Sequence, residues 1–416
     1  MPRSGPPAVN RPAPLGLEPS FGYGDRLGLA TPGHIRAHLQ TGGPVRAVFA
    51  QQSVRELERT RRSCAAVAEA AQAAVDAAGF AQPWGADADH LKEFGDIEAF
   101  VAAGYSFFTI DPSDHVVAEA DSMDRDQLRL AFAEIRDQVP WIEEFEGVEA
   151  DLGEGVRISI GPEGLARCAV KYGRAVNFSL EMATAIDRSC RAASLGYEIE
   201  VSVDETTRPT TLAEHWIVAS RLLDSGVGLA ALAPRYVGGF EKGIDYIGDP
   251  LEFERDANAH ARAAQVLVPY KLSLHSGSDK LSIYPGFARA TGGAFHVKTA
   301  GTSYLEALRV IAATDSALFG RVIAAARRHF ARDRDTYHLS IGLDDAPPPE
   351  QVTAAELADA YLDRDAGRQI AHVTFGSILT DPQLGPLVKG QVECESELYG
   401  DFLERHFNRH LTALNP

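Results

Sequence analysis

The stretch 271–275, with the sequence KLSLH, is one of eight short β-prone runs that decide the fold. Its leucines alternate with Lys271, Ser273 and His275, as expected for a strand with one apolar and one polar face. Ala-rich stretches with helical character, such as 53–78 and 250–266, separate runs of this kind. The eight runs are 26–30, 45–50, 84–88, 106–110, 198–203, 228–233, 271–275 and 294–299. Strands that alternate with helices predict βα units and a parallel sheet.

Eight such units predict an α/β fold, a closed (β/α)8 TIM-like barrel, although a doubly wound open sheet fits the same alternation. A ninth run, 337–342, competes with 26–30 for a place among the eight strands. The barrel is expected over 21–345, after a flexible Pro-rich tail at 1–20. Two further segments complete the predicted domains: an inserted subdomain at 117–196, between strands four and five, and a C-terminal helical extension at 346–416 that packs on the barrel.

Composition and charge exclude several classes of protein. The chain has 416 residues, with 40 Lys and Arg against 58 Asp and Glu, a net charge of −18. Such a surface repels nucleic acid and anionic membranes, so neither is an expected partner. There is no run of 18 apolar residues, no apolar signal core and no paired-cysteine motif, which predicts a cytoplasmic protein without a disulfide scaffold. The chain also lacks the glycine-rich motifs of dinucleotide and P-loop sites.

Polar residues follow nearly every predicted strand, where a barrel of this class carries its chemistry. Alternation turns Glu200 and Asp204 inward on the fifth strand, and we expect Glu200 to pair with Lys271 inside the barrel. His296 and Lys298 share the inner face of the eighth strand. The strand-end residues expected to bind substrate are Gln52, Asp111, Ser276, Asp279, Lys280, Lys298 and Thr302.

Histidines and carboxylates without cysteine favour a divalent cation such as Zn, Ni, Mn or Co. The geometry of the eighth strand suggests His296 as a third ligand, with His338 or a carboxylate as rivals. The helix start at 301–303 would hold an anion, helped by Lys280 and Lys298. Each feature also has a purely structural interpretation, as a hydrogen-bonded core histidine or a helix cap.

Six stretches resemble the tagaturonate/fructuronate epimerase family, which is related to tagatose 4-epimerases. The resemblance covers about residues 20–345. The stretches are 24–34 (GDRLGLATPGH), 49–53 (FAQQS), 88–92 (ADHLK), 107–112 (FFTIDP), 274–280 (LHSGSDK) and 295–303 (FHVKTAGTS).

The resemblance implies a (β/α)8-like isomerase, a metal-dependent epimerase that interconverts D-tagaturonate and D-fructuronate in hexuronate catabolism. It also implies site roles: Asp89 as proton acceptor, His90 as a metal ligand, Glu205 as proton donor and His275 as a further ligand.

The expected chemistry is inversion at C4 of the ketose. The hydrogen on C4 lies β to the ketone and is not acidic, so retro-aldol cleavage between C3 and C4, through an enediolate held by the metal, is the expected route. Transient oxidation at C4 is the rival and needs bound NAD. The alternative functions are a metal-dependent sugar-acid aldolase, a lyase, and a non-catalytic sugar-binding barrel. The expected partners are a small uronate or ketohexose and, in a homo-oligomer, further copies of the chain.

Overall fold

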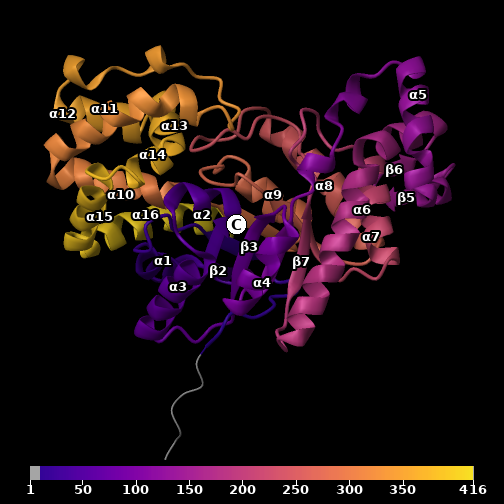
Figure 1. Cartoon of the computed structure of the whole chain (residues 1–416), viewed down its shortest axis with the longest axis horizontal. Helices are drawn as coiled ribbons and strands as arrows, with labels where there is room; N and C mark the ends of the chain where they lie inside the picture. The colour runs from indigo at the N-terminus through magenta and orange to yellow at the C-terminus, as the bar shows by residue number, and fades with distance from the viewer. Residues whose placement is uncertain (1–9, 416) are drawn as a thin grey trace, which may run out of the picture.

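A closed barrel of eight parallel strands forms the centre of the molecule. The computed structural model describes residues 10–415. The strands pair in the order β1-β10-β9-β8-β7-β4-β3-β2, and every neighbouring pair is parallel (Figure 1). The predicted (β/α)8 barrel is therefore confirmed, and the open sheet is excluded. The barrel strands are β1 (Ser20–Tyr23), β2 (Arg46–Ser53), β3 (Trp84–Leu91), β4 (Phe107–Ile110), β7 (Glu198–Ser202), β8 (Leu229–Ala233), β9 (Lys271–Leu274) and β10 (Phe295–Thr299).

The first strand is Ser20–Tyr23, so its prediction at 26–30 is wrong. The carboxylate of Asp25 accepts backbone N–H groups of Leu27, Gly28 and Ala30, which folds that run into a loop. Gly28 has a φ of +79°, a conformation that a strand does not use. In this segment the backbone N–H groups bond to a nearby side chain and not to a neighbouring strand.

The ninth run, 337–342, is not a strand either. Its carbonyls at Leu339 and Ile341 accept hydrogen bonds from Arg334, and the Ser340 N–H donates to Glu241. The segment is therefore tied to a helix end and a loop, and the eight barrel strands are complete without it.

Helices surround the barrel and bury the outward faces of its strands. One continuous hydrophobic core joins strands and helices, and Trp84, Phe108 and Tyr304 are among its fully buried side chains. The helices of this layer are α1 (Thr31–Thr41), α2 (Val54–Thr60), α3 (Cys64–Ala78), α4 (Ile97–Ala102), α6 (Pro162–Ala192), α7 (Leu212–Asp224), α8 (Pro250–Val266), α9 (Tyr284–Thr291) and α10 (Thr302–Thr314).

The insertion between β4 and β7 carries α5 (Arg125–Ile135) and the antiparallel hairpin of β5 (Glu149–Gly153) and β6 (Val156–Ser159). Figure 1 shows α5, β5 and β6 together at one side of the barrel. The long helix α6 follows and packs between α4 and α7, so it serves as a helix of the barrel itself.

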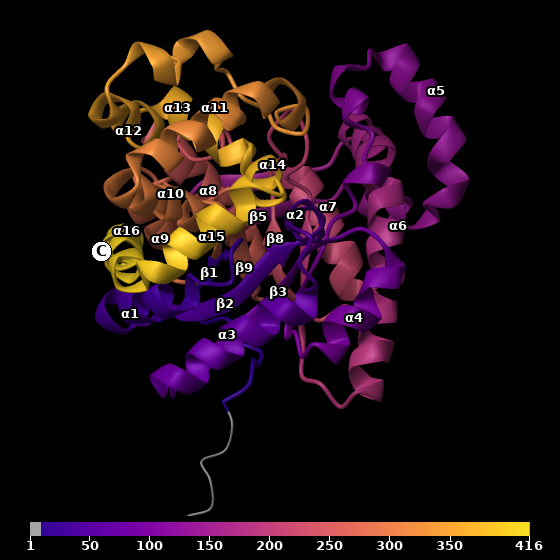
Figure 2. The same cartoon turned by 60° about the vertical axis from the view of Figure 1, so that its left-hand side comes forward.

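The C-terminal extension packs on the opposite side, as Figure 2 shows. Its last helix lies along α1 and also contacts α9 and α10. Before the extension lies α11 (Ser316–Asp333), and the extension itself consists of α12 (Ala354–Leu362), α13 (Asp365–Val373), α14 (Phe375–Leu379), α15 (Leu384–Cys394) and α16 (Ser396–Leu414). Among residues 10–415, no helix has the length and apolar content needed to span a bilayer.

The N-terminal segment crosses the end of the barrel where the strands begin. The backbone N–H groups of Leu15 and Gly16 donate to Glu198 at the start of β7, and Leu15 is buried. The expected flexible tail at 1–20 is thus held against the barrel from residue 10 onward, and its residues 1–9 lie outside the described part of the chain.

Candidate active site

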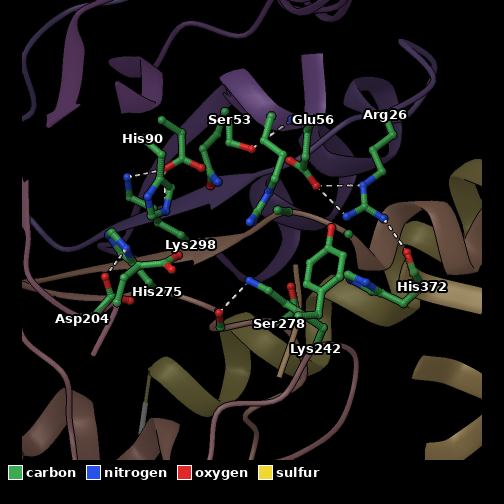
Figure 3. Close-up of a pocket in the computed structure, with 18 residues that line it drawn as sticks. Arg26, Ser53, Glu56, His90, Asp204, Lys242, His275, Ser278, Lys298 and His372 are labelled. Carbon is green, nitrogen blue, oxygen red and sulfur yellow. Dashed lines mark hydrogen bonds and ion pairs between the residues drawn. The ribbon is translucent and has the colours of Figure 1, made fainter. Parts of the chain in front are cut away.

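A polar pocket opens at the carboxyl ends of the barrel strands (Figure 3). Its walls come from segments that follow several of the barrel strands and from the C-terminal extension, which contributes His372. The lining residues are Arg26, Gln51, Ser53, Arg55, Glu56, Asp89, His90, Asp204, Glu205, Lys242, His275, Ser276, Ser278, Lys298, Ala300, Gly301, Tyr337 and His372.

Lys298 stands at the floor of this pocket among three buried carboxylates. Its Nζ lies 2.7 Å from Asp87, 2.7 Å from Asp89 and 2.9 Å from Glu200. Burial opposes the charge of Lys298, but the three carboxylates outweigh it and raise the pKa of the lysine. Burial also raises the pKa of Asp87 to about 7. Lys298 therefore neutralises the charge of the protein's own acids.

Asp89 stays ionised in this setting. Burial alone would raise its pKa, but Lys298, followed by His90 and His275, lowers it below the ordinary value. A buried carboxylate that is held in its charged form next to a cleft can accept a proton from a bound hydroxyl group.

His275, directly after β9, faces the pocket between two acids. Its Nε2 lies 2.7 Å from Glu200 and its Nδ1 3.4 Å from Asp204. Burial would lower the pKa of His275, but Asp204 and Glu200 raise it to about 10. Its Nδ1 is buried and has no hydrogen-bond partner within the described residues.

His90 lies against His275, and the two ring centroids are 4.9 Å apart. The Nδ1 of His90 is 3.0 Å from Asp111, and its Nε2 is 3.7 Å from Asp89. The backbone of His90 has a φ of +58°, and a non-glycine residue in this region is strained. Such strain is typical of functional sites, where the surrounding structure holds a side chain in one orientation.

Glu205, in the loop after β7, approaches this group from the solvent side. One ligand atom from each of His90, Asp111 and Glu205 lies within 4.8 Å of the others. Glu205 is exposed, and it lines both the main pocket and an adjoining one that contains Asp111 and Lys92. The carboxylate can therefore move without breaking a buried hydrogen bond.

Two cations in the pocket have no acidic partner. Neither Arg55 nor Lys242 lies within 4 Å of a carboxylate oxygen in the part of the chain that the structure describes, and Nε of Arg55 is buried without a hydrogen bond. The Nζ of Lys242 donates to Ser276, 2.7 Å away. Burial, and then repulsion from Arg55, lowers the pKa of Lys242. By contrast, Arg26 is neutralised by Glu56. The pocket thus holds positive charge that an anion would compensate.

The structure brings most of the predicted site residues together. Asp89, His90, Glu205, His275, Ser276 and Lys298 line the main pocket, and Asp111 lines the adjoining one.

Asp279 and Lys280 lie beside the site but do not line it. Lys280 donates to the backbone carbonyls of Glu241, Ile244 and Ser278, so its ammonium fastens the loop after β8 to the loop after β9. Asp279 is paired with Arg368 of the C-terminal extension.

His296, Gln52 and Thr302 also lie outside the pocket lining. His296 points into the barrel below Lys298, its Nδ1 is 2.8 Å from Ser20, and its ring packs on Phe107. Gln51, one residue earlier than predicted, is the glutamine that faces the pocket. His338, the rival ligand, is exposed and away from the lining.

The predicted bridge between Glu200 and Lys271 is wrong. Glu200 is paired with Lys298 and His275, while Lys271 donates to Ser20, 3.2 Å away. Lys271 is the first residue of β9, and His275, four residues further along the same face, is the side chain that reaches Glu200.

Sequence reasoning missed Arg55, Lys242 and His372. Arg55 lies two residues after the end of β2, so its position at a strand end could have indicated it. Lys242 lies in a glycine-rich loop between β8 and α8, whose length was the only signal. His372, on α13, had no signal because only the packing of the extension brings it to the pocket.

The closed barrel and the charged pocket at its strand ends define a (β/α)8-barrel enzyme. Residues 8–414 match a family model described as UxaE, tagaturonate epimerase. A relative from Thermotoga maritima, described as a tagaturonate/fructuronate epimerase, is 40% identical over 410 residues, which cover 97% of this chain and 82% of that protein. The crystal structures of fructuronate-tagaturonate epimerase UxaE from Cohnella laeviribosi, native and with one bound glycerol, match with a TM-score of 0.92 at 33% identity, covering 98% of this chain and 83% of theirs. The chain belongs to the tagaturonate epimerase family and is an isomerase.

Proposed function

We propose that this protein interconverts D-tagaturonate and D-fructuronate by inverting C4 of the 2-keto sugar acid, in hexuronate catabolism. The observation that carries the proposal is the combination in one pocket of unpaired cations, Arg55 and Lys242, with the ionised Asp89. The cations match the C6 carboxylate, and the acid matches a hydroxyl group that must lose a proton.

The residues of the pocket also fit a divalent metal ion. His90 and His275 have their rings 4.9 Å apart, and the buried Nδ1 of His275 has no hydrogen-bond partner in the described structure. Two imidazoles with nearby carboxylates are a donor set suited to Zn, Ni, Mn or Co. We propose His90, His275 and one carboxylate, Asp204 or Glu205, as ligands, in place of His296. An ion held there would act as a Lewis acid toward the substrate oxygens.

The chain's own residues support a retro-aldol route. Asp89 accepts the proton of the C4 hydroxyl as the bond between C3 and C4 breaks, which gives an enediolate and a three-carbon aldehyde. The aldehyde turns about its C4–C5 bond, and the C3–C4 bond forms again on its other face. Glu205, on the open side, then returns a proton to the C4 oxygen. Lys298 holds Asp87, Asp89 and Glu200 in place and limits their mutual repulsion.

Arg55 and Lys242 decide between an epimerase and an aldolase in this route. The carboxylate lies on the aldehyde fragment, so cations that bind it retain that fragment while it turns. A site without them would release two three-carbon products, as a lyase does.

The proposal is tested by NMR with fructuronate in deuterated buffer, using enzyme that is stripped with chelator and reloaded with single ions. We expect tagaturonate to form without deuterium at C4 and with ¹³C isotope effects at C3 and C4. Free three-carbon fragments would show an aldolase, and a ¹³C effect at C4 without one at C3 would favour the oxidation route. No conversion with any ion would refute the proposal.

A further inference from the structure

A second group of metal-ligand side chains lies outside the pocket, where the C-terminal helix meets the barrel. His406 and His410, one turn apart on α16, face Asp279 in the loop after β9. All three are buried, with exposures of 5%, 0% and 9%. Figures 1 and 2 both show α16 close to α1 and α9, which agrees with this contact between the end of the chain and the barrel.

Three donor atoms point toward one another in this group. Oδ1 of Asp279 lies 3.7 Å from Nε2 of His406 and 3.4 Å from Nε2 of His410. His406 Nε2 is buried without any hydrogen-bond partner in the described structure. Two ligand atoms that share a tetrahedral Zn²⁺ at its usual bond lengths are about 3.3 Å apart. The spacings are therefore long for hydrogen bonds but close to those of a shared ion.

The other polar atom of each side chain already has a partner. His410 Nδ1 donates to the carbonyl of His406. The lone pair of His410 Nε2 therefore faces Asp279 and accepts the backbone N–H of that residue. His406 Nδ1 lies 3.5 Å from Glu306, and Oδ2 of Asp279 accepts from Arg368. Metal-ligating histidines are normally oriented in this way, with the second nitrogen directed to a carbonyl or carboxylate.

We propose that Asp279, His406 and His410 bind a divalent cation of the zinc type, separate from the ion of the active site. When the ion binds, Nε2 of His410 becomes its ligand and no longer accepts the hydrogen bond from the backbone N–H of Asp279. Its role is structural: it fastens α16 to the loop that carries His275 and Ser276, so it connects the end of the chain to the geometry of the pocket.

The test counts ions in the full chain after removal of metal by chelator and reloading with Zn²⁺ alone, followed by desalting and elemental analysis. We expect two Zn²⁺ per wild-type chain, one in His406→Gln and one in the double variant His90→Gln/His275→Gln. The matched control is His34→Gln, because His34 is also buried against Phe407 but lies outside both groups; it should retain two. Loading with Co²⁺ should give visible absorption from both sites, and His406→Gln should lose the part that comes from this site.

Each outcome separates this proposal from the one above. One ion in wild type that is lost only in the double variant would overturn the second site and leave the active-site ion standing. One ion lost only in His406→Gln would support the second site and refute the active-site ion. If His406→Gln does not fold, His410→Asn serves the same count, and chelator should lower the melting temperature of wild type more than that of the variant, which loses only the active-site ion. Equal melting shifts in both would also overturn the proposal.

Discussion

The cationic side chains in the pocket are of two kinds: some neutralise the protein's own carboxylates, and others remain available to bind a ligand. Lys298 belongs to the first kind, because three carboxylates surround its ammonium. Arg55 and Lys242 belong to the second, because no carboxylate oxygen of the described residues lies within 4 Å of either cation. The distinction leads to different expectations for substitutions that remove the same charge.

Replacing Arg55 with Met should raise KM for the uronate at least tenfold and change KM for the neutral ketohexose little. A charge-assisted contact with a carboxylate is worth about 1.5–3 kcal/mol, which corresponds to a tenfold effect or more. Steady-state kinetics with both substrates measure it. The control is Arg59→Met, since Arg59 lies over the same Tyr337 ring but outside the main pocket. Equal losses for both substrates would refute a role in reading the carboxylate.

Replacing Lys298 with Met should abolish turnover of uronate and ketohexose alike. The change leaves Asp87, Asp89 and Glu200 buried without their cation, which costs about 3–5 kcal/mol of stability. Thermal unfolding and kinetics on both substrates check this result. A selective loss of uronate activity would instead make Lys298 the residue that binds the substrate anion.

Replacing Asp89 with Asn should preserve bound metal and reduce kcat by two to four orders of magnitude, the usual contribution of a general base. His275→Gln should instead lose metal. Elemental analysis together with kinetics distinguishes the two variants. Undiminished turnover in Asp89→Asn would remove this residue from the mechanism.

At the scale of elements, close contacts between backbones fix how β1 closes the barrel. A Cβ on Gly24 would lie 2.4 Å from the carbonyl oxygen of Ala300, just after β10. Gly24 directly follows β1, the strand whose predicted start at residue 26 was six residues too late. The glycine therefore serves the closure of the barrel rather than a turn.

Gly24→Ala should destabilise the fold by about 1–3 kcal/mol, because two backbone segments must separate. Denaturant unfolding followed by circular dichroism measures this loss. Gly164→Ala, in the first turn of α6 where nothing lies within 4 Å of an added methyl group, should leave stability unchanged or slightly higher. Equal stability of the two variants would contradict the tight closure.

For the whole molecule, the buried neutral histidines predict sensitivity to acid. Burial lowers the pKa of His34, His38 and His260 to about 4, whereas the unfolded chain has a value near 6.5. Between these values the unfolded state binds more protons, so stability is full above about pH 6.5 and falls as the pH drops toward 4. Each residue contributes up to about 3 kcal/mol to this loss.

Urea unfolding at pH 7, 5.5 and 4.5 measures the effect. The variant His38→Gln should lose less stability than wild type across this window, because its amide does not titrate. An identical pH dependence in both proteins would show that His38 is protonated equally in the folded and unfolded states.

The sequence by itself determined the alternation of strands and helices, since their periodicities are local patterns, whereas the closure of the sheet and the position of its first strand came from the tertiary structure. It also located Asp89, His90, His275 and Lys298, because parallel strands bring their carboxyl ends to one mouth. The height of a side chain within the barrel was a different matter. The stagger of neighbouring strands sets it, so Lys271 and His296 were placed too high.

Only the tertiary structure decided which charges are satisfied and which remain open. A lysine reads the same in sequence whether carboxylates surround it, as at Lys298, or none does, as at Lys242. Likewise, His406 and His410 form a plain helical pair until α16 packs against the loop of Asp279. These properties depend on contacts between residues far apart in the chain, which local patterns do not encode.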